Sequence, residues 1–168
     1  MADTIQVRPA TQADLDAILD IYNHAVIHTT ASYDYEPWNR QQRQDWFDDH
    51  AKNDYPVLVA QEGGAGRVVG WGSLSRFHSR YGYRFTAEDS VYVAEEYRGR
   101  GVGRQLLAPL IDAARARKFH SIIGLIDAQN DVSIRLHGRF GFEKVAYLKQ
   151  VGHKFGRWLD VVYMQLML

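Results

Sequence analysis

Three glycines at alternate positions, within residues 98–104, are the first feature of this sequence that suggests chemistry. An apolar segment at 90–93 precedes them, and a helical pattern starts at about Val102. Glycine allows a tight turn and has no Cβ, so its N–H groups can approach an anion at the positive end of a helix. The spacing predicts a strand, a phosphate-binding turn and a helix. The expected contacts come from the backbone of Gly99, Gly101, Val102 and Gly103 and from the side chains of Arg98, Arg100 and Arg104.

Two better-known phosphate-binding loops do not match this stretch. A Walker loop needs Gly-Lys followed by Ser or Thr, but Gly103 is followed by Arg104 and Gln105. A dinucleotide fingerprint needs Gly-x-Gly-x-x-Gly, and the final position holds Arg104 or Leu106 in the two possible registers. An ordinary glycine-rich surface turn is the structural alternative.

Glu88 is the candidate general base, because it lies at the start of the strand that leads to the glycine turn. A carboxylate can take a proton from an ammonium group directly or through one water. The alternative is a solvated glutamate paired with Arg80 or Arg84, which is the usual fate of such a residue.

His137 is the second candidate for proton transfer. Asn130, Ser133 and His137 are spaced i, i+3 and i+7, so they share one face of a helix, which we expect to face the ligand. An unperturbed imidazole titrates near ~6.5, so His137 can act as an acid when charged or as a hydrogen-bond donor when neutral. The alternative is a partly buried histidine bonded to a carbonyl.

The composition indicates one compact domain over residues 1–168, with 46% hydrophobic and 24% charged residues. Twenty acidic and twenty Lys and Arg residues give no net charge, so nothing indicates nucleic acid or an anionic membrane as a partner. Without cysteine there is no thiolate nucleophile, so an acyl group must be transferred directly or through another nucleophile. The histidines show no metal-ligand spacing, and we expect no metal.

The sequence also indicates a cytoplasmic location. No apolar run approaches the ~20 residues of a membrane span. The N-terminus, Met1 to Thr4, lacks the basic and then apolar pattern of a signal peptide.

Hydrophobic periodicity predicts the elements that position these residues. Strands are expected at 5–8, 56–60, 67–74, 86–94, 120–126, 142–151 and 158–168, with Gly-Gly-Ala-Gly at 63–66 as a hairpin turn and 152–157 as a loop. Helices are expected from an N-cap at Thr11 to about 27, from Asn39 to about 52, from 102 to 114 and from 130 to 140. Pro109 should kink the third helix. The order predicts an α/β fold, a mixed and mostly antiparallel central sheet covered by helices.

The glycine turn, read as Arg-x-x-Gly-x-Gly, resembles the pyrophosphate-binding motif of the Gcn5-related N-acetyltransferases (GNAT). Asn130-x-x-Ser133, with Gly-Phe at 141–142, resembles that superfamily's second cofactor motif. The segments 33–37, 80–93 and 152–160 resemble the phosphinothricin acetyltransferase branch, which includes acetyltransferases for methionine sulfoximine and methionine sulfone. The resemblance covers nearly the whole chain. It implies an acyl-CoA N-acyltransferase fold, acetyl-CoA as acetyl donor, and the α-amine of a small, modified amino acid as acceptor.

The same resemblance implies further site residues. The strand residues Val91, Tyr92 and Val93 should bind the pantetheine amides by main-chain pairing. Much of the superfamily has a tyrosine, credited with protonating the coenzyme A thiolate, where this chain has His137. A zwitterionic acceptor needs a cation and polar donors, which we expect among Tyr33, Arg76, Phe77, His78, Arg80, Tyr83, Thr86 and Lys154. For aromatic residues such as Tyr33 and Phe77, core packing is the alternative.

Two other functions remain open from the sequence. One is acetylation of protein N-termini or lysines, against which the aromatic segment 33–38 argues. The other is a non-catalytic acyl-CoA-binding module, which the retained Glu88 disfavours. Resembling enzymes are commonly homodimers, so a homodimer is expected by analogy.

Overall fold

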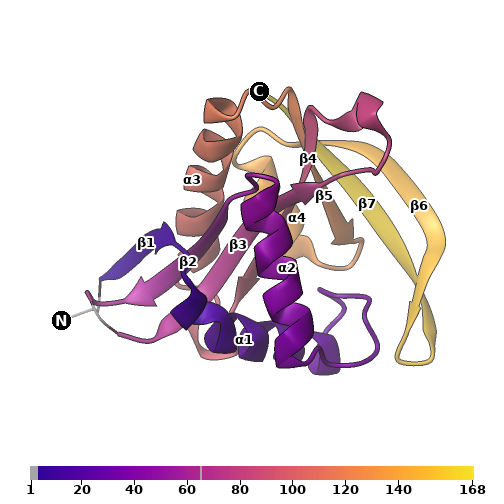
Figure 1. The fold of residues 1–168 in the computed structure, drawn as a ribbon. Coiled ribbons are helices and arrows are strands. Elements are labelled where there is room, and N and C mark those ends of the chain that lie inside the picture. The colour runs from indigo at the N-terminus through magenta and orange to yellow at the C-terminus, as the bar shows by residue number, and fades with distance from the viewer. Residues whose placement is uncertain (1–3, 65) are drawn as a thin grey trace.

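The computed structural model describes residues 4–64 and 66–168, so the N-terminal residues 1–3 and position 65 of the glycine hairpin lie outside the described residues. One seven-stranded sheet has the order β1-β2-β3-β4-β5-β7-β6 (Figure 1). Its strands are β1 (Ile5–Pro9), β2 (Val57–Glu62), β3 (Val68–Arg76), β4 (Thr86–Val93), β5 (Ser121–Asp127), β6 (Glu143–Lys154) and β7 (Arg157–Met167). The helices are α1 (Leu15–His28), α2 (Arg40–Lys52), α3 (Val102–Ala116) and α4 (Asp131–Gly138), with three short 3₁₀ turns.

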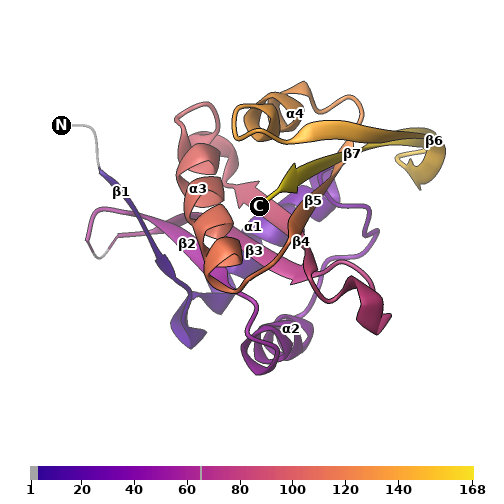
Figure 2. The same cartoon turned by 90° about the horizontal axis from the view of Figure 1, so that it is seen from above.

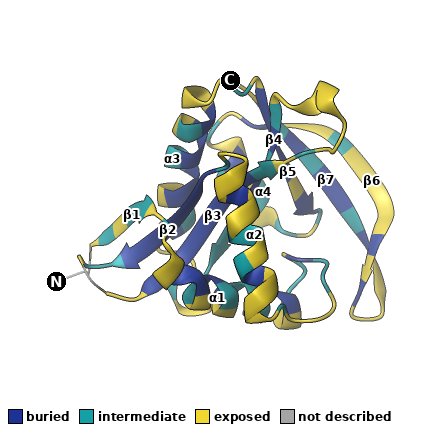
Figure 3. Cartoon of the chain, in the orientation of Figure 1, coloured by how far each residue is buried: buried dark blue, intermediate teal, exposed yellow. Residues whose placement is uncertain are grey.

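The helices cover both faces of the sheet, with α1 and α2 on one face and α3 and α4 on the other (Figure 2). The apolar residues of α3 pack with the central strands into the larger buried cluster, which includes Val69, Ala87 and Leu106. The apolar stripe of α1 forms a second cluster with Val59 and Trp71. Figure 3 shows the central strands as the buried layer between the helices. A sheet buried on both faces explains why its central strands read as continuous apolar runs.

The pairing of β4 with β5 is the feature of the sheet that matters most for the site. Every other neighbouring pair is antiparallel, whereas β4 and β5 are parallel. Their pairing covers only three positions and ends at Glu88 opposite Ile123. Beyond that point β4 still pairs with β3 as far as Val93, and β5 still pairs with β7 as far as Asp127. The two strands therefore separate from residues 89 and 124 onward.

Most of the expected elements are present, and the sheet is mixed and mostly antiparallel as predicted. Asn39 caps α2, because its side chain accepts a hydrogen bond from the backbone N–H of Gln42. Asn130 caps α4 in the same way through Ser133. The helix α3 runs through Pro109, so the expected kink does not divide it.

The expected loop at 152–157 is wrong. β6 continues to Lys154 and β7 begins at Arg157, which leaves a two-residue turn at Phe155 and Gly156. Both turn residues have positive φ, of 52° and 70°. This is the backbone conformation of the turns that best match the twist of a β-hairpin. Polar and glycine residues near the hairpin end suggested a loop, but the hydrogen bonds of the neighbouring strand extend the ladder.

A buried arginine fixes α2 against α1. Arg43 is 1% exposed, and its guanidinium carbon lies 4.5–5.2 Å from the ring centroids of four aromatic residues: Tyr22, Trp38, Trp46 and Trp71. Burial lowers the pKa of Arg43 to about 10. Cation–π contacts therefore supply much of what a carboxylate would normally provide for this charge. No helix among the described residues has the length and apolar character needed to cross a membrane.

Candidate active site

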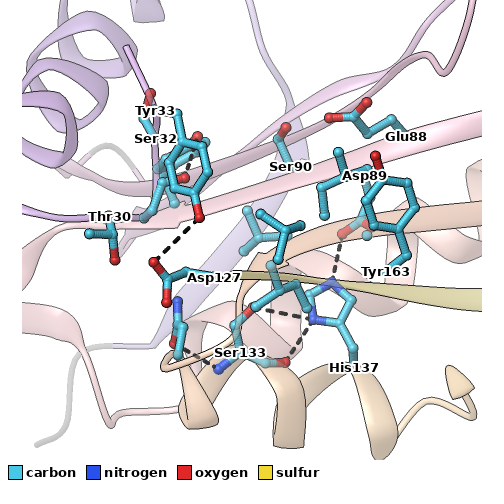
Figure 4. A pocket seen from close by; sticks show the side chains of 18 of the residues that line it. Thr30, Ser32, Tyr33, Glu88, Asp89, Ser90, Asp127, Ser133, His137 and Tyr163 are labelled. Atoms are coloured by element: carbon cyan, nitrogen blue, oxygen red, sulfur yellow. Dashed lines mark hydrogen bonds and ion pairs between the residues drawn. The ribbon is translucent and has the colours of Figure 1, made fainter. Parts of the chain in front are cut away.

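A cavity of about 620 Å³ occupies the place where β4 and β5 separate. Its walls come from both strands, from α4, from β6 and β7, and from the segment 30–33 that follows α1 (Figure 4). It is lined by Thr30, Ala31, Ser32, Tyr33, Glu88, Asp89, Ser90, Val91, Tyr92, Gly124, Leu125, Ile126, Asp127, Asn130, Ser133, His137, Leu148, Val151, Val161 and Tyr163. The candidate residues Glu88, Asn130, Ser133 and His137 therefore share one cavity, although they come from two distant parts of the chain.

Glu88 reaches the cavity from the α1 side of the sheet. Successive side chains of a strand alternate between faces. Tyr92 packs into the α1 cluster, and Ala87 packs into the α3 cluster, so Glu88 shares the face of Tyr92. Burial, and secondly the charge of Asp89, raise the pKa of Glu88 to about 7. A carboxylate with this pKa can accept a proton near neutral pH.

His137 is buried and reaches the cavity from the α4 side. Its Nε2 lies 2.9 Å from Oδ2 of Asp89, and its Nδ1 lies 2.8 Å from the backbone oxygen of Ser133. The ring of Phe142 stands edge-on to it, with centroids 4.9 Å apart. Burial lowers the pKa of His137, but the hydrogen bond and charge of Asp89, with the Ser133 carbonyl, outweigh burial and raise it overall. His137 thus makes the hydrogen bond to a carbonyl that was the structural alternative, and it also lines the cavity as expected of a residue that faces the ligand.

The glycine turn has the open backbone that an anion would need. Gly99 and Gly101 have positive φ, of 76° and 82°, and no atom lies within 4 Å of the place where either would carry a Cβ. Gly101 directly precedes the first residue of α3, Val102. Exposed N–H groups at the start of a helix suit a phosphate. Gly103 differs, because a Cβ there would lie 3.2 Å from Leu136, so this glycine also lets α3 approach α4.

The pantetheine contacts expected at Val91, Tyr92 and Val93 would use a part of β4 that does not pair with β5. Beyond Glu88, the edge of β4 that faces β5 has no strand partner among the described residues. Val91 and Tyr92 line the cavity, whereas Val93 does not, and the carbonyl of Val93 accepts a hydrogen bond from Arg98. The side chains of Arg98, Arg100 and Arg104 are exposed.

Tyr33 is the one expected acceptor-binding residue that lines the main cavity. Its hydroxyl donates a hydrogen bond of 3.4 Å to Asp127, as Figure 4 shows. Lys154 has a different position. It is 2% exposed, and its ammonium donates to the backbone oxygens of Thr29, at 2.9 Å, and Ser32, at 2.5 Å. Lys154 therefore holds the segment that carries Tyr33, and its ammonium faces that segment's carbonyls.

The remaining expected acceptor residues lie elsewhere. Arg76, His78 and Arg80 line a second cavity of about 210 Å³, which shares no lining residue with the first. The rings of Phe77 and His78 pack against Tyr83, with centroids 6.0 and 4.8 Å apart. The hydroxyl of Thr86 lies 3.2 Å from that of Ser121 on β5. Thr86 is two residues from Glu88 on the same face of β4, but none of these residues lines the main cavity.

Asp89, Gly124, Asp127 and Tyr163 are among the cavity residues that the sequence analysis did not anticipate. Asp89 did carry a signal, because it alternates with Ala87 and Val91 on a strand face that is otherwise apolar. A charged residue on a buried face needs a partner. Gly124 interrupts the apolar run of β5, which often marks a close approach by another group.

The family described as the acetyltransferase (GNAT) family matches residues 19–142. A relative from Pseudomonas aeruginosa, named L-methionine sulfoximine/L-methionine sulfone acetyltransferase, is 48% identical over 95% of this chain and 92% of its own length. A ribosomal-protein-alanine N-acetyltransferase structure from Brucella melitensis is 47% identical, with a TM-score of 0.94, over 97% of this chain and 99% of that one.

A further solved structure contains the acetyl donor. It is a GNAT phosphinothricin acetyltransferase from Sinorhizobium meliloti in complex with acetyl-CoA, 38% identical, with a TM-score of 0.94 over 100% of this chain and 89% of that one. The family match, the relatives and the common fold agree with the family that the glycine turn indicated. This chain is an acetyl-CoA-dependent N-acetyltransferase and belongs to the GNAT family.

Proposed function

We propose that this protein acetylates the α-amine of a small, modified amino acid, such as methionine sulfoximine, methionine sulfone or phosphinothricin. The observation that carries the proposal is Glu88, a largely buried carboxylate at the cavity with a pKa of about 7. Such a group can accept the proton of an α-ammonium at neutral pH, which leaves the nitrogen lone pair free to attack. The names of the relatives from Pseudomonas aeruginosa and Sinorhizobium meliloti support the same class of acceptor.

We assign the donor site to the glycine turn and to the free edge of β4. Acetyl-CoA supplies an acetyl thioester when it is bound. The open backbone of Gly99 and Gly101 and the start of α3 fit its pyrophosphate. The unpaired backbone beside Val91 fits the amides of its pantetheine arm. Arg98, Arg100 and Arg104 add positive charge around the turn.

Acetylation of a protein or peptide amine is the second candidate, because the Brucella melitensis structure, at 47% identity, is described as a ribosomal-protein-alanine N-acetyltransferase. The two candidates differ in the room they need around the amine. Here Tyr33 and the segment held by Lys154 form one wall of the cavity. This wall supports a compact acceptor over a peptide.

A competition of acceptors separates the candidates. Steady-state kinetics with acetyl-CoA would compare methionine sulfoximine, methionine sulfone and phosphinothricin with an N-terminal alanine peptide and a lysine peptide. We expect the highest kcat/KM on one of the small compounds. A higher kcat/KM on either peptide than on all three compounds would support the second candidate and reject the first.

We further propose a homodimer and a cytoplasmic location, with residues 1–168 acting as one acetyltransferase domain. The hairpin of β6 and β7 supports the dimer. β6 is an edge strand, and this hairpin exposes several large apolar side chains: Val145, Tyr147, Leu148, Val151, Phe155 and Trp158. Exposed apolar surface of this kind is typical of an interface. Analytical ultracentrifugation across a concentration series tests the dimer, and a monomer at micromolar concentration would reject it.

A further inference from the structure

The pair Asp89–His137 is the most deeply buried titratable pair at the cavity. The side chains are 1% and 5% exposed, and Oδ2 of Asp89 lies 2.9 Å from Nε2 of His137. Nδ1 of His137 lies 2.8 Å from the backbone oxygen of Ser133. A carbonyl oxygen only accepts hydrogen bonds, so these partners assign a proton to Nδ1. A second proton must then lie between Nε2 and Oδ2, because an unprotonated nitrogen would face a carboxylate lone pair.

The surroundings favour the charged form of the ring. Burial lowers the pKa of His137, but Asp89 and the Ser133 carbonyl raise it by more, so the net shift is upward. Glu88 is the neighbouring acid on β4, and Tyr163 of β7 stands beside Asp89 in Figure 4. Farther along β5, Asp127 faces Tyr33. Exposed Arg135 on α4 and exposed Arg139, which directly follows α4, are the cations of this segment.

The pair sits at the point where the sheet opens. Asp89 and Gly124 are the first residues beyond the last β4–β5 pair, Glu88 opposite Ile123. A Cβ at Gly124 would lie 3.1 Å from Oδ1 of Asp89 and 3.3 Å from Nε2 of His137. Glycine thus leaves room beside the pair on its β5 side. Oδ1 is buried and has no hydrogen-bond partner within residues 4–64 and 66–168.

Glu88 and Asp89 lie on opposite faces of the sheet at the point where β4 and β5 separate. They are adjacent on an extended strand, so their side chains point to opposite faces of the sheet. An acyl transfer needs a base on the side of the incoming amine and an acid on the side of the departing group. The cavity passes between these two sides, because it is lined by Glu88 as well as by Asp89 and His137.

We propose that Asp89 is a positioning residue that holds His137 in its doubly protonated form, so that Nε2 can give its proton to the departing thiolate. This inference rests on the proposed function. Glu88 takes the ammonium proton, the nitrogen lone pair forms the N–C bond, and the electron pair of the broken C–S bond stays on sulfur. His137 transfers the Nε2 proton to that sulfur, and the nitrogen, which still carries one surplus proton after the N–C bond forms, returns it to Nε2 as the neutral amide is released. Charge and atoms balance without a further reactant.

Asp89→Asn is the discriminating substitution. The amide has the shape of the carboxylate, and its N–H can donate to the unprotonated Nε2, so the ring keeps its place. In this variant His137 loses only the proton on Nε2 and keeps the proton on Nδ1. A purely structural role for Asp89 would therefore survive in this variant, whereas a role in keeping His137 charged would not.

The first measurement is the ionisation of His137 itself, followed by NMR of the protein labelled with ¹⁵N-histidine across pH 5 to 9. We expect wild-type His137 to keep both protons above the pH at which exposed histidines titrate. In Asp89→Asn its titration should move down by about one unit or more. No acceptor is needed, so this result stands even if every proposed substrate fails. Ordinary titration of His137 in the wild type would overturn the proposal.

The second measurement is the pH profile of kcat on the best acceptor. The acid must be protonated, so the wild-type rate should fall at high pH as His137 loses its proton. In Asp89→Asn this descending limb should shift to lower pH, and kcat at pH 8 should drop about 10²-fold. KM for acetyl-CoA should change little. His137→Gln, which cannot supply the proton at any pH, should lose kcat across the whole range and serves if Asp89→Asn does not fold.

Asp54→Asn is the matched control, since Asp54 is a carboxylate paired with Arg117 outside the cavity. Its profile should match the wild type. A profile of Asp89→Asn that is only scaled down, with both limbs unmoved, would show that Asp89 acts through packing alone and would reject the proposal.

Discussion

The ring of Tyr33 lies directly against the backbone of Gly152, so that a Cβ at position 152 would come within 2.8 Å of the Cδ2 atom of Tyr33. Two segments more than a hundred residues apart thereby meet at the cavity wall. Tyr35 strengthens the contact, because its hydroxyl donates to the backbone oxygen of His153 at 2.6 Å. The position of Tyr33 is therefore set by the β6–β7 hairpin.

Gly152→Ala should displace Tyr33 and raise KM for the amino-acid acceptor several-fold, with a smaller effect on KM for acetyl-CoA. Overpacking of this kind also destabilises, by about 1–3 kcal/mol. Gly64→Ala is the control, because no atom lies within 4 Å of a Cβ there. Kinetics and thermal unfolding of the two variants test the contact. An unchanged KM for the acceptor in Gly152→Ala would exclude Tyr33 from acceptor binding.

Gly101→Ala should weaken acetyl-CoA binding at least ten-fold by calorimetry. The substitution adds a methyl group to the turn and strains a backbone with φ of 82°. Gly63→Ala is matched for strain, since Gly63 has φ of 61° and is also open, but it lies in the β2–β3 hairpin. Equal affinity for acetyl-CoA in the two variants would rule out the glycine turn as the phosphate site.

Glu88→Gln should lower kcat by about 10²-fold or more while acetyl-CoA still binds, which is the usual scale for positioned proton transfer. The base must be ionised, so the wild-type rate should rise as pH passes about 7, the pKa of Glu88. The glutamine variant should lack this rise. Near wild-type turnover across that range would mean that water or another group takes the proton.

The same shift predicts a stability effect with a defined sign. Glu88 ionises near 4.5 in the unfolded chain but near 7 in the folded protein, because burial, and then Asp89, disfavour its charge. Rising pH from 4.5 to 7 therefore favours unfolding at this group, and above 7 the penalty is constant. Glutamine carries no such penalty. The Tm of Glu88→Gln should exceed the wild-type Tm at pH 8 and equal it near pH 4, and a constant difference would contradict the shift.

Lys154→Met tests whether this lysine acts on the acceptor or on the fold. The methionine fills similar space but leaves the carbonyls of Thr29 and Ser32 without their donor. Unsatisfied buried acceptors cost about 1–3 kcal/mol each, so denaturant unfolding should show a clear loss. Lys149→Met, on the exposed part of β6, should show none. Full stability combined with a raised KM for the acceptor would instead favour direct contact with the acceptor.

The sequence by itself determined the local features of this protein. The alternation of apolar residues, the caps at Asn39 and Asn130 and the glycines before Val102 are short-range signals, so strands, helices and the turn followed from them. The family resemblance rested on the same motifs. The prediction of a loop at 152–157 was wrong, because pairing between β6 and β7 overrides the weak strand propensity of the residues near Lys154.

Only the tertiary structure decided how the site is assembled. The early end of β4–β5 pairing creates the cavity, and this depends on how two strands thirty residues apart diverge. Asp89 meets His137 across 48 residues, and Lys154 meets Thr29 across 125. Burial and partner charge then set the pKa of Glu88 and of His137. These distances and environments are properties of packing, and no local pattern in the sequence encodes them.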